Sequence, residues 1–121
     1  MRILIVESSK ELSTLWRLHL ERLGGEVHIA HSQDSATELL LELNPQVIVL
    51  DLVLEEGSAL AVADFASYRR PEARVIFVTN TSFFSDGSIF RHCANACAFL
   101  PIATAPSDLA AMVEHYGRVP A

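Results

Sequence analysis

Residues 44–52 read NPQVIVLDL: a turn signal at Asn44-Pro45, an apolar run from Val47 to Leu50, and then an acidic residue, Asp51. A short apolar run that is rich in β-branched residues and bounded by turn signals is typical of a strand buried on both faces. A carboxylate at the end of such a strand is costly to bury unless it caps a helix, binds a cation or reacts. Asp51 is therefore either a chemically active group or a polar residue that ends the strand, and its position alone does not separate these two interpretations.

Two more apolar runs of the same kind occupy residues 3–6 and 75–78, and shorter strands are predicted over residues 27–30 and 98–100. Between these runs, apolar residues recur at the spacing of amphipathic helices. That spacing predicts helices over residues 8–23, 32–43, 58–69, 88–95 and 106–116. Strands that alternate with helices in this way predict an α/β fold, a doubly wound five-stranded parallel sheet with helices on both faces. We expect one stand-alone domain over residues 1–121.

The first predicted helix has recognisable ends. Ser8 is followed three residues later by Glu11, which matches the capping-box pattern and predicts that Ser8 caps the N-terminus of the helix. Gly24 and its neighbour Gly25 mark the other end. Trp16 lies at helical spacing within this segment and is predicted to be a core residue.

The composition excludes some classes of function. Nine Lys and Arg residues against fifteen Asp and Glu residues give a net charge of −6, whereas a nucleic-acid-binding module should be locally basic. No apolar run approaches the ~20 residues needed to span a bilayer, so we expect a cytoplasmic protein with no membrane contact. The two cysteines, Cys93 and Cys97, have no second ligand pair at zinc spacing and are predicted to be structural thiols.

Polar residues at the carboxyl ends of the predicted strands are the candidates for chemistry, because functional groups of open parallel sheets collect at that edge. The candidates are Glu7-Ser8, Asp51, Thr79 and the segment after Leu100. The turn after the first strand contains no glycine, which excludes a dinucleotide fingerprint and a P-loop there.

Four segments resemble the receiver domain of response regulators in two-component signalling. They are residues 3–6 with the acidic residue that follows, residues 44–52, the strand 75–79 with its terminal hydroxyl, and residues 96–100 (ACAFL). The order and spacing of these segments agree with the receiver family over nearly the whole chain. The resemblance implies a flavodoxin-like (βα)5 receiver fold and a signalling module rather than an enzyme.

The resemblance also implies a role for individual residues and for partners. Asp51 would be the phosphoacceptor, Thr79 the switch hydroxyl and Phe99 the switch aromatic. Glu7 would hold Mg²⁺ together with Asp51. The implied partners are a sensor histidine kinase or a phosphotransfer protein, and a downstream protein.

Three positions depart from the receiver pattern. Ser8 stands where the family has a second carboxylate, Ile102 where it has a lysine, and Glu55 where it usually has a proline. Lys10 is the only lysine in the chain, so no shift of register restores the missing one. Losing a charge-assisted contact to a phosphoryl group removes about 1.5–3 kcal/mol, so we expect a weak Mg²⁺ and phosphoryl site.

Two functions from different classes follow from these observations. The first is a phosphorelay module whose acceptor is Asp51. The second is a pseudo-receiver, a protein-interaction module that does not depend on phosphorylation. A different enzyme on the same fold is a more distant third interpretation.

Aromatic residues gather in the last third of the chain, at Phe83, Phe84, Phe90, Phe99 and Tyr116. Aromatic enrichment with few charges is typical of the core of a protein interface. This composition predicts a homodimer or a stable partner complex through the face made by the helix at 88–95, the strand at 98–100 and the last helix.

Overall fold

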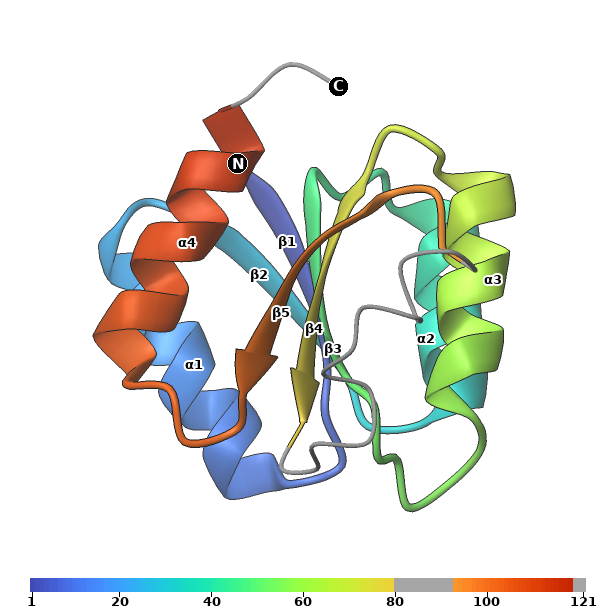
Figure 1. The fold of residues 1–121 in the computed structure, drawn as a ribbon, viewed down its shortest axis with the longest axis horizontal. Helices are drawn as coiled ribbons and strands as arrows, with labels where there is room; N and C mark the ends of the chain where they lie inside the picture. Colours follow the sequence, from blue (N-terminus) through green and yellow to red (C-terminus); the bar gives the residue numbers. More distant parts are fainter. Residues whose placement is uncertain (80–92, 119–121) are drawn as a thin grey trace.

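The computed structural model describes residues 1–79 and 93–118. Five strands form one sheet in the order β2-β1-β3-β4-β5, and every neighbouring pair is parallel (Figure 1). The strands are β1 (Arg2–Val6), β2 (Glu26–Ala30), β3 (Val47–Asp51), β4 (Arg74–Thr79) and β5 (Ala96–Pro101). The predicted doubly wound parallel sheet is confirmed, and β3 with its terminal Asp51 lies at the centre of the sheet.

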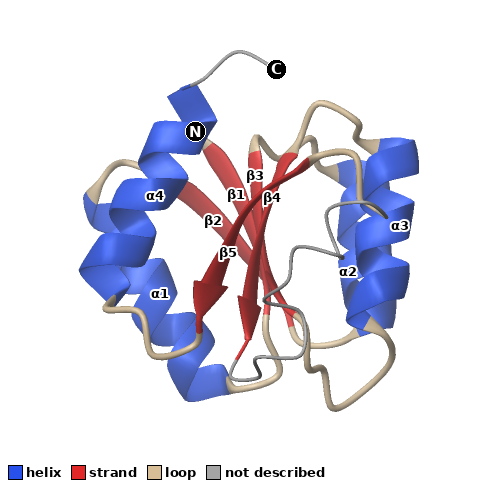
Figure 2. Ribbon diagram, viewed as in Figure 1, coloured by secondary structure: helices blue, strands red, loops and turns tan. Residues whose placement is uncertain are grey.

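Helices cover both faces of the sheet. They are α1 (Lys10–Arg22), α2 (Gln33–Glu42), α3 (Ala59–Arg69) and α4 (Pro106–Arg118). Figure 2 shows α1 and α4 side by side on one face, and α2 and α3 on the other. The helix predicted over residues 88–95 falls mostly outside the described residues. Its last part, residues 93–95, is a turn in which the Ala96 N–H donates to the Cys93 carbonyl.

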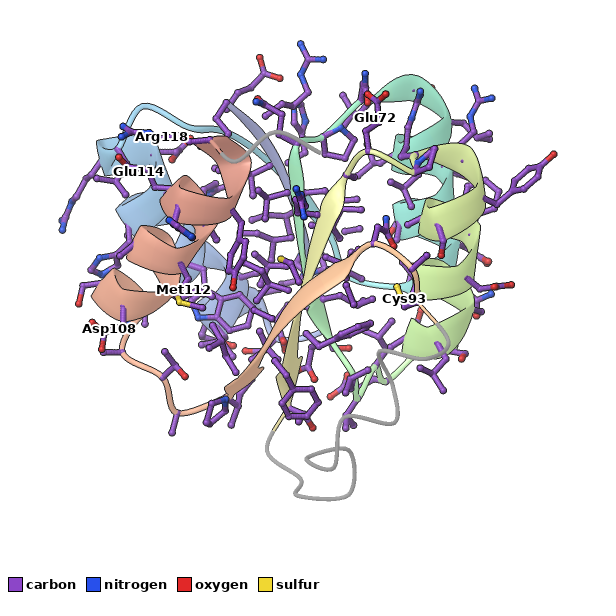
Figure 3. All side chains as sticks on the ribbon, turned by 45° about the horizontal axis from the view of Figure 1, so that its top comes forward. Glu72, Cys93, Asp108, Met112, Glu114 and Arg118 are labelled. Atoms are coloured by element: carbon purple, nitrogen blue, oxygen red, sulfur yellow. The ribbon has the colours of Figure 1, made fainter. Side chains whose placement is uncertain are left out.

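The sheet separates two apolar clusters. One cluster packs between the sheet and α2 and α3 and includes Leu4, Leu40 and Phe77. The other packs between the sheet and α1 and α4 and includes Ile5 and Trp16, which is buried as predicted. Side chains fill the space on both sides of the sheet, with Cys93 on the α3 side and Met112 on the α4 side (Figure 3).

The start of α1 differs from the prediction. Ser9, not Ser8, caps this helix, and its hydroxyl accepts a hydrogen bond of 3.2 Å from the Leu12 N–H. The capping box predicted between Ser8 and Glu11 is therefore wrong. The reason is a tertiary contact, because the Ser8 hydroxyl accepts a hydrogen bond from the loop that follows β3.

The other helix starts follow ordinary capping chemistry. Ser32 caps α2, and Ser35 completes a reciprocal capping box with it. Ser58 caps α3 by accepting a hydrogen bond from the Ala61 N–H. Among the residues 1–79 and 93–118, no helix has the length and apolar character needed to cross a bilayer.

Candidate functional site

Three predicted site residues come together at the carboxyl edge of the sheet. Asp51 ends β3, Thr79 ends β4 beside it, and Glu7 follows β1 on its other side. All three are buried, with exposed fractions of 7% for Asp51, 2% for Thr79 and 4% for Glu7. Such burial of two carboxyl groups is unusual for a surface rim, because carboxylates are almost never fully buried without a partner.

Asp51 is held by its own loop. The Val53 N–H donates a hydrogen bond of 2.9 Å to Asp51 Oδ1. The Leu52 N–H donates to the Val78 carbonyl at 2.9 Å, which continues the β3–β4 pairing one residue past Asp51. The carboxyl group is thus oriented by the chain that immediately follows it, so its direction depends on the conformation of this loop.

Glu7 carries the strongest electrostatic perturbation at the site. The Ser9 N–H donates to its Oε1 at 3.1 Å, whereas its buried Oε2 lies near the Asp51 carboxyl group and accepts no N–H from residues 1–79 and 93–118. Burial raises the pKa of Glu7 to about 8, and the neighbouring carboxyl groups of Asp51 and Glu55 add to the rise. Glu7 therefore keeps its proton at neutral pH unless a cation replaces it.

The donor set fits a small divalent cation. Mg²⁺ favours hard oxygen ligands and often uses only one or two carboxylates with several waters. Glu7 and Asp51 supply two adjacent carboxyl groups, and the buried Glu7 Oε2 is an oxygen that a cation could bind in place of a proton. In the described part of the chain, no cluster of three or more His, Cys, Asp and Glu side chains is arranged to hold a metal ion.

The residues that depart from the receiver pattern have other contacts. Ser8 Oγ accepts a hydrogen bond of 2.9 Å from the Glu55 N–H. The Ile102 N–H donates to the Thr79 carbonyl at 2.8 Å, so Ile102 lies at the same edge of the sheet. The Ile102 side chain packs against the apolar cluster under α1 and α4, so position 102 presents no charge to the site.

The predicted switch aromatic, Phe99, lies one strand further out. It pairs with Phe77 across the β4–β5 ladder and packs, half-buried, against the apolar cluster under α2 and α3. Tyr116 is also half-buried, and it packs on the α1 and α4 side. Phe83, Phe84 and Phe90 of the predicted interaction face lie outside the described residues.

Sequence reasoning missed one residue of the site, Gln33 at the start of α2. Its Oε1 accepts a hydrogen bond of 2.8 Å from the Ser58 N–H, and its own N–H donates to the Glu56 carbonyl at 3.1 Å. Gly57, between these two residues, has a φ of +95°. That glycine was the one available signal of a tight turn. Nothing in the local spacing points to a residue 25 positions away.

The two thiols behave as structural groups. Cys93 Sγ donates to Asn95 Oδ1 at 3.1 Å, and Cys97 Sγ donates to the Val75 carbonyl at 3.5 Å. Burial raises the pKa of Cys97 to about 11 and also raises that of Cys93. Both thiols therefore stay protonated, and poorly nucleophilic, at neutral pH.

Comparison with known proteins supports the receiver resemblance. No family model matches the chain. The photosynthetic apparatus regulatory protein RegA of Rhodobacter capsulatus is 30% identical over 77 residues, which cover 64% of this chain and 42% of RegA. The chain thus spans less than half the length of this curated relative.

Solved structures agree over nearly the whole chain. A CheY-like response regulator receiver domain from Methanospirillum hungatei superposes with a TM-score of 0.87 at 22% identity and covers 96% of this chain and 92% of its own. The N-terminal domain of a response regulator, sensory box and GGDEF protein from Carboxydothermus hydrogenoformans has a TM-score of 0.85 at 26% identity, with 98% and 94% covered.

A response regulator from Burkholderia pseudomallei, solved with a phosphorylated aspartic acid and a calcium ion, has a TM-score of 0.81 at 21% identity and covers 97% of this chain and 72% of its own. The parallel five-stranded sheet, the buried acidic residues at its carboxyl edge and these similarities lead to one assignment. The chain has the fold of response-regulator receiver domains and is similar in sequence to response regulators.

Proposed function

We propose that this domain is a phosphorelay signalling module of a two-component system, with Asp51 as its phosphoacceptor. The observation that carries the proposal is the placement of Asp51 at the centre of the sheet edge, 7% exposed, between Glu7, which follows β1, and Thr79, which ends β4. The similar structure from Burkholderia pseudomallei, which holds a phosphorylated aspartic acid, supports this use of such a site.

In the proposed reaction, an Asp51 carboxylate oxygen forms a bond to the phosphorus of a phosphodonor. The bond between phosphorus and the donor atom breaks, and the donor leaves with the bonding electron pair and takes up a proton. The donor would be the phosphohistidine of a sensor histidine kinase or of a phosphotransfer protein. The Val53 N–H would hold Asp51 Oδ1 during this step, because it already donates to that oxygen.

Glu7 and Asp51 would hold Mg²⁺, whose charge would offset the charge of the phosphoryl group. We expect this site to be weak for two reasons. Ser8 is engaged with the Glu55 N–H and contributes no charge. Ile102 is a partly buried apolar side chain that packs against the cluster under α1 and α4, so it supplies no positive charge. The Thr79 hydroxyl and Phe99 are the proposed switch residues, on β4 and β5 respectively.

The test is phosphorylation by a small phosphodonor with Mg²⁺, followed by intact-mass measurement. We expect one phosphoryl group on the wild-type protein and none on Asp51→Asn. Asp64→Asn, at an exposed aspartate on α3, is the matched control and should be phosphorylated like the wild type. Phosphorylation of Asp51→Asn to the wild-type level would contradict the assignment of the acceptor.

One observation favours a second function, that of a pseudo-receiver. Burial raises the pKa of Glu7 to about 8 and Ser8 is uncharged, so the cation site is short of negative charge, and the apolar Ile102 brings no cation to a phosphoryl group. A pseudo-receiver would act in the cytoplasm by binding a protein partner in a single state. It would remain unphosphorylated in the mass measurement under conditions that fully phosphorylate a typical receiver domain.

A further inference from the structure

The loop that follows Asp51, residues 52–58, is called the acceptor loop below. Leu52 and Leu54 pack against the apolar cluster under α2 and α3. The hydrogen bonds that the loop makes to β4, to Asp51 and to α3 come from the Leu52 N–H, the Val53 N–H and the Ser58 cap. Within residues 1–79 and 93–118, Ser8 and Gln33 make further hydrogen bonds to its backbone from outside the loop.

We propose that Ser8 and Gln33 are positioning residues that hold the acceptor loop in place. In this proposal the Ser8 hydroxyl binds the loop and is not a ligand of a metal ion. The turn after β1 supplies Ser8, and the start of α2 supplies Gln33. Together they make three hydrogen bonds to the loop, at 2.9 Å to the Glu55 N–H, 2.8 Å to the Ser58 N–H and 3.1 Å to the Glu56 carbonyl.

The Ser8 contact depends on which residue occupies position 55. The donor is a backbone N–H, and proline has none. Two departures from the receiver pattern, Ser8 and Glu55, therefore meet in one hydrogen bond. A proline at position 55 would leave the Ser8 hydroxyl without this partner, and a residue without a side-chain oxygen at position 8 would leave the Glu55 N–H without its acceptor.

Gln33 contacts the second half of the acceptor loop, at residues 56–58. A Cβ built on Gly57 would overlap Gln33 Cβ and would lie 2.7 Å from Gln33 Oε1, so the loop backbone passes directly over this side chain. A side chain at position 57 would collide with Gln33, and the φ of +95° already favours glycine there. The close approach and the two hydrogen bonds fix the loop relative to α2.

Loop position matters for Asp51 because Val53 lies between Asp51 and Glu55. The Val53 N–H orients Asp51 Oδ1 at 2.9 Å, so a loop that is free at Glu55 would hold Asp51 less firmly. Misplacement of a reacting group by about 1 Å costs roughly a hundredfold in rate. This consequence for phosphotransfer rests on the proposed function, whereas the role of Ser8 as a loop anchor does not.

The anchor is tested first in metal-free protein, by NMR measurement of amide hydrogen exchange. Ser8→Ala should speed exchange of the Glu55 N–H about tenfold, the effect of losing a hydrogen bond of ordinary strength. Ser8→Thr keeps the hydroxyl and should keep the wild-type rate. Gln33→Ala should speed exchange of the Ser58 N–H, and Gln33→Glu, which keeps an acceptor oxygen, should not. Unchanged Glu55 exchange in folded Ser8→Ala would overturn the proposal.

The second measurement distinguishes a loop anchor from a cation ligand. If Ser8 were a ligand, Ser8→Ala would weaken Mn²⁺ binding and leave the metal-free exchange of Glu55 unchanged, which also overturns the proposal. If Ser8 is a positioning residue, phosphorylation of Asp51 in Ser8→Ala should be several-fold slower, and Ser8→Thr should restore it. Failure to phosphorylate the wild-type protein would contradict the proposed function. The amide-exchange measurement would still decide whether Ser8 holds the loop.

Discussion

At the scale of single residues, the site is defined by two buried carboxyl groups that share one place on the sheet edge. Glu7 and Asp51 are both nearly inaccessible to solvent, and the pKa of Glu7 is raised to about 8. In an unfolded chain the same group titrates near 4.5. The folded protein therefore binds one more proton than the unfolded chain between these two pH values.

This difference predicts how stability changes with pH. The contribution of Glu7 to the free energy of unfolding is complete below about pH 4.5, falls as the pH rises toward about 8, and is then lost. The loss is on the order of a few kcal/mol. Glu7→Gln should flatten this decline, as measured by urea unfolding at several pH values without divalent cations. Glu11→Gln, at an exposed position on α1, is the control and should keep the decline.

The same proton should compete with a cation. Because Glu7 must be deprotonated to bind Mg²⁺, affinity should rise as the pH increases toward about 8. Titration of Mg²⁺ against amide chemical shifts at two pH values would measure this. A wild-type affinity that Asp51→Asn leaves unchanged would contradict the placement of the site between Glu7 and Asp51.

Reversing two departures from the receiver pattern should increase the rate of phosphotransfer to Asp51. Ser8→Asp with Ile102→Lys should raise phosphotransfer to Asp51 by a factor of about ten or more, because the two changes restore a carboxylate and a cation near one phosphoryl group. Their effects should not add, since both act on that group. Ile102 is packed against apolar side chains, so the lysine must extend its charged end toward solvent or the site.

The rescue is read from the initial rate of phosphorylation and from the urea midpoint of each variant. A folded double variant that is no faster than the wild type would show that the acceptor loop has also diverged. Adding Glu55→Pro to the double variant then tests the loop directly, because it removes the N–H that binds position 8.

At the scale of elements, the capping of α1 shows where sequence reasoning reaches its limit. Ser8 and Ser9 are both serines before an amphipathic helix, and Ser8 also has Glu11 three residues later. The local pattern therefore favours Ser8, yet Ser9 caps the helix. The deciding contact joins Ser8 to Glu55, 47 residues away, and no local pattern reports a contact of that kind.

Elements whose ends depend on local chemistry were predicted well. Ser32 and Ser58, the first residues of two predicted helices, cap α2 and α3. The apolar runs within β1 and β3 were recognisable because a strand buried on both faces has no polar alternation. The face of α1 was less predictable. Leu15, next to the buried Trp16, is 41% exposed, so apolar spacing alone does not define the buried face of α1.

The acceptor loop gives a prediction with an internal control. Gly57 and Gly24 both have positive φ, +95° and +86°, but only a Cβ at position 57 would collide with another residue. Gly24→Ala should cost about 1 kcal/mol from backbone strain alone. Gly57→Ala should cost more, about 2–4 kcal/mol, because the clash with Gln33 is added to the strain. Urea unfolding measures both, and equal losses would contradict the close approach to Gln33.

At the scale of the whole molecule, the alternation of strand and helix patterns was enough to predict the architecture. Parallel strands need crossover helices, and right-handed crossovers leave few ways to arrange five such units. The candidate site followed from the topology, because carboxyl ends of neighbouring strands must meet. The hydrogen bonds of Ser8, Gln33 and Ile102 did not follow, since they depend on how the finished turns pack.

The association of molecules remains a prediction at this scale. Phe83→Ser with Phe84→Ser should shift a homodimer toward monomer in sedimentation, because the two rings would supply the apolar centre of the interface. Tyr68→Ser is the control. Tyr68 is 85% exposed on α3, which is not one of the elements of the predicted face, and its loss should leave sedimentation unchanged.

If the wild-type protein is monomeric at high micromolar concentration, the homodimer prediction is wrong. The alternative, a stable complex with another protein, would then require that a partner be identified and that the Phe83→Ser and Phe84→Ser variant lose it. Phe99 and Tyr116 are unsuitable for this test, since both pack against the apolar clusters.

The edge strand β5 touches both layers of the molecule. Phe99 packs toward α2 and α3, whereas Leu100 and the adjoining Ile102 pack toward α1 and α4. The end of β4 is connected to this segment by the hydrogen bond from the Ile102 N–H to the Thr79 carbonyl. A conformational change that begins beside Asp51 and reaches Thr79 would therefore move one segment that contacts both helix layers. A partner protein bound to either pair of helices would then detect the same change.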